Sequence, residues 1–187
     1  MLFEFEGKSP ITGSETYISE HATVIGDVKI GNKCYIGHGA ILRGDYGKIE
    51  IADGTAVEEG VIIHAPPGEL CYIGNKVTLG HGAVIHSRYI GELAVIGMGA
   101  ILSIRSEVQT GSIIAEGAVV KQNQIIPPDV VAAGNPAKIL RKINEKDKER
   151  WNTGKQLYID LAKRYLHNPL KPVSSHTIKT GKEIHND

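Results

Sequence analysis

Hydrophobic side chains recur at every sixth position over most of this chain. The aliphatic residues on this frame are Ile18, Val24, Ile30, Ile36, Leu42, Ile51, Val57, Ile63, Ile73, Leu79, Ile85, Ile90, Ile96, Leu102, Val108, Ile114, Val120, Ile126 and, with a smaller side chain, Ala132. Four residues after most of them stands a small or β-branched residue, such as Ala22, Cys34 or Ala100. A period of six fits neither the 3.6-residue turn of an α-helix nor the two-residue alternation of a plain strand. It is typical of hexapeptide repeats, which build a parallel β-helix.

Three such repeats make one triangular coil of about 18 residues, with the aliphatic side chain pointing inward and the small one beside it. The 22 glycines suit tight turns at the corners, because glycine adopts unusual backbone angles at little cost. A β-sandwich would instead show alternation within strands and turn signals about every 8–12 residues. We therefore predict an all-β solenoid.

The sequence divides into four segments. Residues 1–17 are expected to cover the open N-terminal end of the solenoid, and residues 18–135 to form the β-helix itself. Residues 136–167 are rich in helix formers and place Trp151, Leu157, Tyr158, Leu161 and Tyr165 at helical spacings, which predicts an amphipathic α-helix packed back on the solenoid. Residues 168–187 are polar and lack a period, which predicts a loosely ordered tail.

Composition excludes several classes of partner. Lys plus Arg and Asp plus Glu both number 21, so no basic surplus indicates nucleic-acid binding. No apolar run approaches the ~20 residues of a membrane helix, and the first residues lack the apolar core of a signal peptide. Cys34 and Cys71 give no disulfide framework, which favours a cytoplasmic location.

Three breaks in the six-residue frame decide where the histidines fall. Three extra residues lie between Leu42 and Ile51, four lie between Ile63 and Ile73, and one is missing before Ile90. Counting across these breaks places Leu42, Ile63 and Ile85 at the same corner of successive coils. The residues that follow them are Arg43, His64 and His86.

These three side chains should form an outward column with neighbours about 4.8 Å apart, the spacing of adjacent strands. Two imidazoles at that spacing can share one metal ion at Zn–N distances of about 2.0–2.1 Å. His81 lies one corner back, beside Glu59, and extended chain separates it from His86 by up to roughly 17 Å. A neighbouring copy in a three-fold assembly could supply it. The alternative is a chance stack of surface histidines, with Arg43 and Asp45 as a solvated ion pair.

The motifs at these positions resemble those of the γ-class carbonic anhydrases and their relatives. The matching stretches are Leu42-Arg43-Gly44-Asp45, GVIIH at 60–64 and LGHGAVIH at 79–86, and the resemblance spans about residues 1–166. That family consists of left-handed parallel β-helices that form homotrimers and bind zinc, iron or cobalt at subunit interfaces. The resemblance implies that His64 and His86 bind Zn²⁺ (with Fe²⁺ or Co²⁺ as alternatives) together with His81 of the neighbouring subunit.

Other roles follow from the resemblance alone. Arg43 and Asp45 match a pair that bridges subunits and orders the site, and Glu59 would keep an acidic partner for Arg43. Glu58 replaces a glutamine that hydrogen-bonds near the metal-bound water, so an acceptor-only carboxylate stands there. Tyr158 matches a tyrosine placed over the active site, although its helical spacing is equally consistent with packing on the solenoid.

The implied activity is metal-dependent hydration of CO2 to bicarbonate, the reaction of a carbonate dehydratase. Two departures from the family pattern predict modest turnover. Tyr46 stands where the archetypal enzyme has a glutamate, and the loop after His64 is only APPGEL, with Glu69 as a poor substitute for a proton-shuttling glutamate. The stretches FEGKSP, RGDYG and RWNTGKQLY also resemble the relatives encoded with carnitine and phenylacetate metabolism.

Two alternatives stay open. A hexapeptide acyltransferase or acyl-CoA thioesterase would bind acyl-CoA between subunits and use a histidine as general base. A trimeric metal-binding scaffold would have no catalytic activity. Three histidines that converge on one ion would favour CO2 hydration over acyl transfer, because their nitrogens would not be free for base catalysis.

Overall fold

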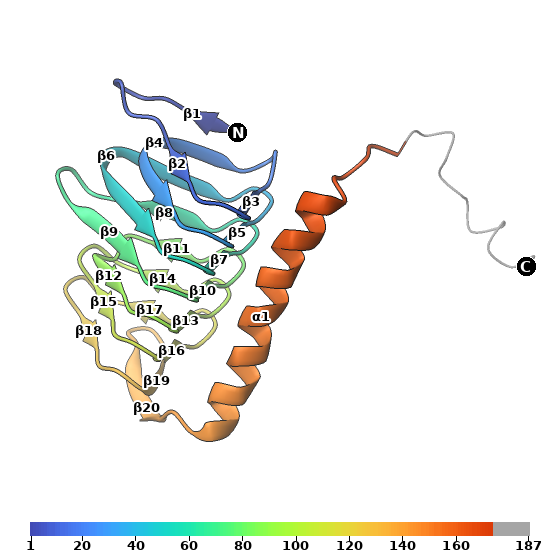
Figure 1. Ribbon diagram of the computed structural model, residues 1–187. Coiled ribbons are helices and arrows are strands. Elements are labelled where there is room, and N and C mark those ends of the chain that lie inside the picture. The colour runs from blue at the N-terminus through green and yellow to red at the C-terminus, as the bar shows by residue number, and fades with distance from the viewer. Residues whose placement is uncertain (174–187) are drawn as a thin grey trace, which may run out of the picture.

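The chain winds into a parallel β-solenoid of about 7 coils with one C-terminal helix, as the six-residue period predicts. The computed structural model describes residues 1–173 (Figure 1). Two faces of the solenoid belong to one 12-stranded sheet. Its strands are β1 (Leu2–Phe3), β2 (Ile11–Thr12), β4 (Thr23–Ile30), β6 (Ile41–Ile51), β8 (Ile62–His64), β9 (Leu70–Ile73), β11 (Val84–Ile85), β12 (Tyr89–Ile90), β14 (Ile101–Leu102), β15 (Glu107–Val108), β17 (Val119–Val120) and β18 (Ile125–Ile126).

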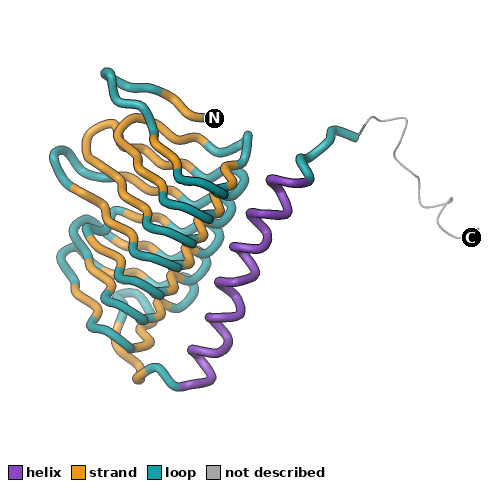
Figure 2. Tube along the Cα trace, in the orientation of Figure 1, coloured by secondary structure: helices purple, strands orange, loops and turns teal. Residues whose placement is uncertain are grey.

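We call the side formed by β8, β11, β14 and β17 the first face, and the side formed by β9, β12, β15 and β18 the second face. The third face is a separate 8-stranded sheet. Its strands are β3 (Tyr17–Ile18), β5 (Tyr35–Ile36), β7 (Ala56–Val57), β10 (Thr78–Leu79), β13 (Val95–Ile96), β16 (Ile113–Ile114), β19 (Val130–Ala133) and β20 (Lys138–Lys142). Figure 2 shows the short strands stacked along the solenoid, with turns between them at the corners.

The long strand β6 carries the chain around the corner between the first and second faces. Its first part, Ile41–Arg43, pairs with β8, and its last part, Lys48–Ile51, pairs with β9. The first frame break lies in this bend, and the second lies in the turn from Ala65 to Glu69 that links β8 to β9. Both breaks therefore fall at the corner where the histidine column stands.

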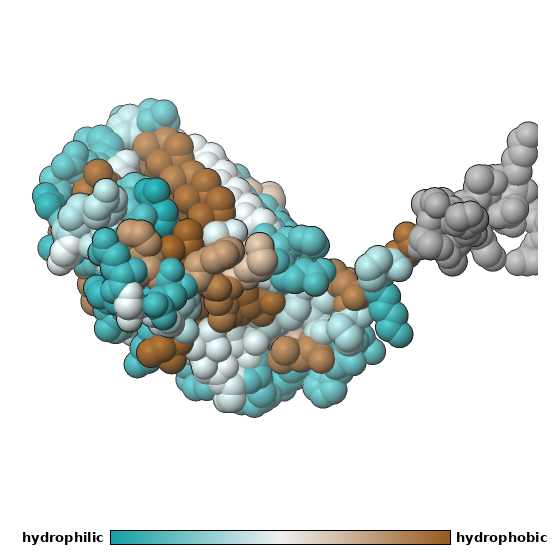
Figure 3. Space-filling model, turned by 90° about the horizontal axis from the view of Figure 1, so that it is seen from above, coloured by the Kyte–Doolittle hydropathy of each residue, from teal (hydrophilic) through white to brown (hydrophobic). Residues whose placement is uncertain are grey.

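The core consists of the aliphatic residues on the six-residue frame. Ile36, Leu42, Ile63 and Ile85 are among the fully buried side chains, and small residues such as Ala83 pack beside them. Burial of one such aliphatic side chain contributes about 1.5–3 kcal/mol. At the N-terminal end, β1 and β2 pair with β4 and leave Leu2, Phe3 and Ile11 exposed. From this end, hydrophobic residues form a contiguous band between hydrophilic ones (Figure 3).

The C-terminal segment differs from the prediction of a helix over 136–167. Residues 138–142 form β20, which pairs antiparallel with β19 and so uses the edge that the last coil leaves open. The helix α1 runs only from Glu145 to His167 and begins at a capping box, in which the side chains of Asn144 and Asp147 each accept a backbone hydrogen bond from the other.

Helix α1 lies along the third face (Figure 1). Tyr158, Leu161, Ala162 and Tyr165 pack there against aromatic and small residues of β3, β5 and β7. Leu157, predicted to share that apolar side, is 64% exposed, whereas Lys155 is buried with 4% of its surface exposed.

No helix among residues 1–173 is long and apolar enough to cross a membrane. The predicted polar tail begins after α1, and its residues 174–187 lie outside the described part of the chain.

Candidate metal centre

Arg43, His64 and His86 stand in the column that the repeat predicts. Parallel pairing sets Arg43 opposite His64 and Ile63 opposite Ile85, so His86 follows on the next coil. The ring centroids of His64 and His86 are 5.0 Å apart, and the rings meet edge to face at 67°. Two imidazoles from consecutive coils therefore converge at one corner of a single chain.

Arg43 and Asp45, both on β6, fix the ring of His64. Its Nε2 lies 3.2 Å from Nη2 of Arg43 and 3.3 Å from Oδ1 of Asp45, and the guanidinium also pairs with that carboxylate at 3.5 Å. The His64 side chain is 12% exposed, and its buried Nδ1 has no hydrogen-bond partner within residues 1–173. A buried nitrogen without a partner costs free energy unless a ligand satisfies it.

His86 is less enclosed. It borders a pocket of about 320 Å³ whose other walls include Val84, Ile101 and Ile104. Burial lowers the pKa of His86, and the nearby His64 and Arg43 lower it further. The lower pKa favours the neutral imidazole, which is the form that binds a metal ion.

His81 lies at the next corner back, where the third face meets the first, and not beside His64. Its Nδ1 is 2.8 Å from Oε2 of Glu59, and its Nε2 is 3.1 Å from Oε2 of Glu58. The Glu58 carboxylate also accepts the backbone N–H of His81 at 3.1 Å. Two carboxylates thus hold an imidazole that is 47% exposed.

Two tyrosines support these carboxylates from the third face. The Tyr35 hydroxyl donates to Oε1 of Glu59 at 2.6 Å, and Tyr158 on α1 lies close to Glu58. Burial raises the pKa of Glu58, whereas for Glu59 the effect of burial is outweighed by hydrogen bonds from Tyr35 and its own backbone and by nearby histidines, which lower its pKa. Burial and the neighbouring Glu58 raise the pKa of the Tyr158 hydroxyl.

The eight predicted site residues therefore fall into two groups. Arg43, Asp45, His64 and His86 share one corner, and Glu58, Glu59, His81 and Tyr158 share the other. Arg43 contacts Asp45 and His64 but not Glu59 within the chain. Across residues 1–173 no group of three or more His, Cys, Asp or Glu side chains is placed to hold a metal ion. A three-histidine site would need a second copy, as the sequence predicts.

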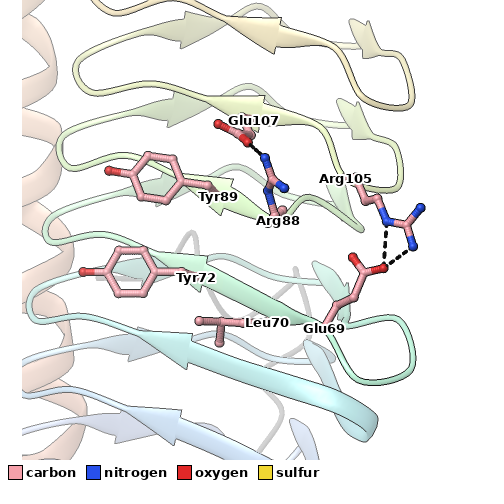
Figure 4. Close-up of a pocket in the computed structure, with 7 residues that line it drawn as sticks. All are labelled: Glu69, Leu70, Tyr72, Arg88, Tyr89, Arg105 and Glu107. Atoms are coloured by element: carbon pink, nitrogen blue, oxygen red, sulfur yellow. Dashed lines mark hydrogen bonds and ion pairs between the residues drawn. The ribbon is translucent and has the colours of Figure 1, made fainter.

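Tyr46 and Glu69, the two residues at which the sequence departs from the family pattern, have well-defined contacts. Tyr46 is 67% exposed, and its ring lies 6.3 Å from that of His64, edge to face. Glu69 faces Arg105 in a shallow pocket of about 600 Å³ on the second face (Figure 4), where Arg105 Nε donates to it at 2.7 Å and Nη2 donates as well. The stacked rings of Tyr72 and Tyr89, 5.7 Å apart, line the same pocket. A carboxylate held in this way is poorly suited to carry protons.

Sequence reasoning missed two residues. Tyr35 stands on the outer side of β5, at a position where the later strands of that face carry the small residues Ala56, Thr78 and Val95. That contrast in size was a usable signal. Nothing in the sequence indicated that Lys155 is buried, because a lysine on an amphipathic helix is normally exposed.

Several known proteins are similar to this chain in sequence. No family model matches the sequence. Gamma carbonic anhydrase 2, mitochondrial, of Arabidopsis thaliana is 36% identical over 161 residues, which cover 83% of this chain and 58% of the relative. A carbonic anhydrase of Geobacillus kaustophilus is 31% identical and is covered over 91% of its length, against 88% of this chain. The carnitine operon protein CaiE of Proteus sp. is 32% identical, with 87% of this chain and 83% of the relative covered.

Solved structures with the same fold carry names of another activity. A hexapeptide transferase family protein from Anaplasma phagocytophilum is 34% identical, with a TM-score of 0.83 over 88% of this chain and 97% of that one. A putative acetyltransferase from Bacillus cereus is 29% identical, with a TM-score of 0.85 over 88% and 95%. The chain spans only 58% and 63% of the length of two plant relatives.

Proposed function

Because the chain belongs to the γ-class carbonic anhydrase-like family of hexapeptide-repeat proteins, we propose that it hydrates CO2 to bicarbonate at a metal ion held between subunits of a homotrimer. His64 and His86 of one subunit and His81 of the next would be the ligands. Zn²⁺ is the expected ion, with Fe²⁺ or Co²⁺ as alternatives, since all three accept imidazole nitrogen.

The observation that carries this proposal is the arrangement of the two histidine corners at the edges of one apolar face. Between them, the first face exposes an aliphatic ladder, defined by Ile41, Ile62, Val84, Ile101 and Val119, which follow one another in register. Ile41, Ile62 and Ile101 are 38–41% exposed. A cyclic assembly that buries this ladder on its axis would bring the His81 corner of one copy to the His64 and His86 corner of the next.

The donor set fits a metal ion. His64 has a buried nitrogen without a partner, His86 has a lowered pKa, and their rings are 5.0 Å apart. When bound, such an ion lowers the pKa of water to about 7 and so supplies hydroxide at neutral pH.

The protein's own groups would orient the ligands and admit the substrate. Arg43 and Asp45 hold the His64 ring, while Glu58 and Glu59 hold the His81 ring from both nitrogens. Such supporting contacts commonly change metal affinity by about 10- to 100-fold when removed. The pocket beside His86 is walled by Val84, Ile101 and Ile104, which suits an apolar molecule as small as CO2. With Glu69 engaged by Arg105, proton export should be slow and turnover modest.

A stopped-flow CO2 hydration assay of the zinc- and iron-loaded protein tests the proposal. We expect a rate above buffer that is lost in His86→Ala and kept in His21→Ala, because His21 is an exposed histidine whose ion-pair partner is Glu20. Metal analysis of the same samples should show loss of the ion in the first variant alone. If the metal-loaded wild type hydrates CO2 no faster than buffer does, the proposal is wrong and the non-catalytic scaffold is the remaining alternative.

An acyltransferase is the second candidate, favoured by the names of the two structural neighbours. It predicts acyl-CoA turnover that survives metal removal, because a general-base histidine needs a free nitrogen. Hydration activity that disappears with the metal would reject it.

We also infer a cytoplasmic location from the two unpaired cysteines, Cys34 and Cys71, which are both buried. The plant relatives are named as mitochondrial, so fractionation of the source cells is the direct test.

A further inference from the structure

Lys155 is a buried amine beneath α1. Its side chain lies between the helix and the third face, with 4% of its surface exposed. Nζ donates to the Ala94 carbonyl oxygen at 3.3 Å and to Thr78 Oγ1 at 3.4 Å, and it lies 6.0 Å from the centre of the Trp151 ring. Both hydrogen bonds are long, and no carboxylate of residues 1–173 comes within 4.0 Å of this nitrogen.

An ammonium group has three protons to place, and this site offers only two distant acceptors. A buried charge without a partner is costly, so the uncharged amine with a free lone pair is favoured. Burial accordingly lowers the pKa of Lys155 to about 7.

Lys155 also borders open space. Lys155 lines a cavity of about 420 Å³ between α1 and the turns that precede β10 and β13. The charged groups that line it besides Lys155 are Lys76 and Glu92, and the amide side chains of Asn152 and Gln156 complete its polar wall. Lys76 is exposed, so its ammonium can reach the mouth of the cavity while the aliphatic stem packs near Ile159 and Gly54.

We propose that Lys155 is a carbamate-forming site for CO2, separate from the proposed metal centre. The Nζ lone pair attacks the carbon of CO2, an N–C bond forms, and one C=O π pair moves onto oxygen. The nitrogen then loses one proton to water, and the product is the N-carboxylate of Lys155. No oxidant, cofactor or metal ion takes part.

The surroundings match this product. The remaining carbamate N–H keeps the Ala94 carbonyl as its acceptor, and the Thr78 hydroxyl can turn to donate to the new carboxylate. Lys76 supplies the compensating positive charge, whereas Glu92 opposes the product. CO2 is small and uncharged, so it can reach a lysine of which only 4% of the surface is exposed.

Chemical trapping tests this site directly. The full-length protein is equilibrated with ¹³C-labelled CO2 and bicarbonate near pH 7.5 and treated with a trialkyloxonium ion, which alkylates the carbamate carboxylate. Peptide mass spectrometry should then find the label on Lys155 at about tenfold the level on Lys163, an exposed lysine of the same helix. The label should vanish in Lys155→Met.

Two charge variants make the result specific. Lys76→Met should lower the trapped fraction by about two- to fivefold, and Glu92→Gln should raise it by a similar factor, the range expected of an exposed charge. Both variants keep Lys155 and the histidine corners intact. Labelling of Lys155 no higher than that of Lys163, or changes of the opposite sign in these variants, would overturn the proposal. Metal-free protein should give the same result, so failure here is distinguishable from failure of CO2 hydration.

Discussion

Tyr35 links the packing of α1 to the carboxylate that holds His81. Its ring is 2% exposed and packs against that of Tyr158, with centroids 5.3 Å apart, while its hydroxyl donates to Glu59. Tyr35→Phe keeps the packing and removes only the hydrogen bond. We expect a loss of about 1 kcal/mol in the free energy of unfolding, since Glu59 is partly exposed and water can replace the donor.

Urea denaturation at neutral pH measures that loss. Tyr46→Phe is the matched control, because the Tyr46 side chain is 67% exposed and its hydroxyl should contribute nothing measurable. Equal effects of the two changes would contradict the role assigned to Tyr35.

Lys155 should make stability rise with pH. In the folded protein its pKa is about 7, against 10.5 for an unburied lysine. Between these values the unfolded chain binds the proton and the folded chain does not, so unfolding becomes harder as pH increases. In CO2-free buffer the wild type should gain stability from pH 7 toward 10, by an amount of order a few kcal/mol.

Lys155→Met should remove most of that gain, whereas Lys163→Met should keep it. Denaturant midpoints of the wild type and both variants, recorded across the pH range, measure this dependence of stability on pH. A wild-type curve that stays flat, or an unchanged slope in Lys155→Met, would mean that the buried lysine keeps its proton.

At the level of single residues, the repeat frame determined what the sequence could reveal. The period of six fixes which corner a residue occupies, so the column of Arg43, His64 and His86 followed from counting alone. Partners across a corner depend on side-chain reach, which the period does not encode. The contacts of Glu59 with Tyr35 and of Arg105 with Glu69 therefore appear only in the folded chain.

The turns of the solenoid use glycine for two different reasons. At Gly117 the backbone has φ of +65° and no atom lies within 4 Å of the position that a Cβ would take, so only the left-handed conformation disfavours a side chain. At Gly97 a Cβ would lie 2.5 Å from the Glu116 nitrogen and 2.7 Å from the Ala115 carbonyl carbon on the next coil. There the close approach of two backbones excludes a side chain.

The two glycines should therefore respond unequally to alanine. Gly117→Ala should cost about 1–2 kcal/mol from the backbone conformation, and Gly97→Ala about 3 kcal/mol because two backbones must separate. Each serves as the other's control in urea unfolding. If Gly117→Ala lowered the free energy of unfolding more than Gly97→Ala, the backbone conformation, and not the close approach of neighbouring coils, would be the main reason for glycine at these corners.

The C-terminal elements mark where sequence patterns were insufficient. Residues 138–142 contain good helix formers, yet they form β20 because the edge of β19 offers backbone partners. Asn144 then starts α1 as its cap. The helix itself was predictable from its composition, but its first residue depends on a tertiary edge that a local pattern does not contain.

On the scale of the whole molecule, the proposed metal should stabilise the assembly. A ligand that binds only the folded state adds about 2.7 kcal/mol when its concentration is 100 times its Kd. Chelation should thus lower the Tm of the wild type, and restored Zn²⁺ should recover it. His86→Ala should show neither response, while His21→Ala should behave like the wild type. Scanning calorimetry with and without chelator measures these changes in Tm.

Division of the site between two copies has a sharper consequence. In a trimer of His81→Ala subunits every site lacks its third imidazole, and in a trimer of His86→Ala subunits every site lacks one of the stacked pair. A mixed trimer joins an intact His64 and His86 corner on one subunit to an intact His81 corner on its neighbour, so one of its three sites is complete. Unfolding and refolding the two variants together should therefore restore metal binding and CO2 hydration that neither recovers alone. A site built within one chain would gain nothing from mixing, and mixing two batches of His86→Ala carrying different tags controls for the refolding itself.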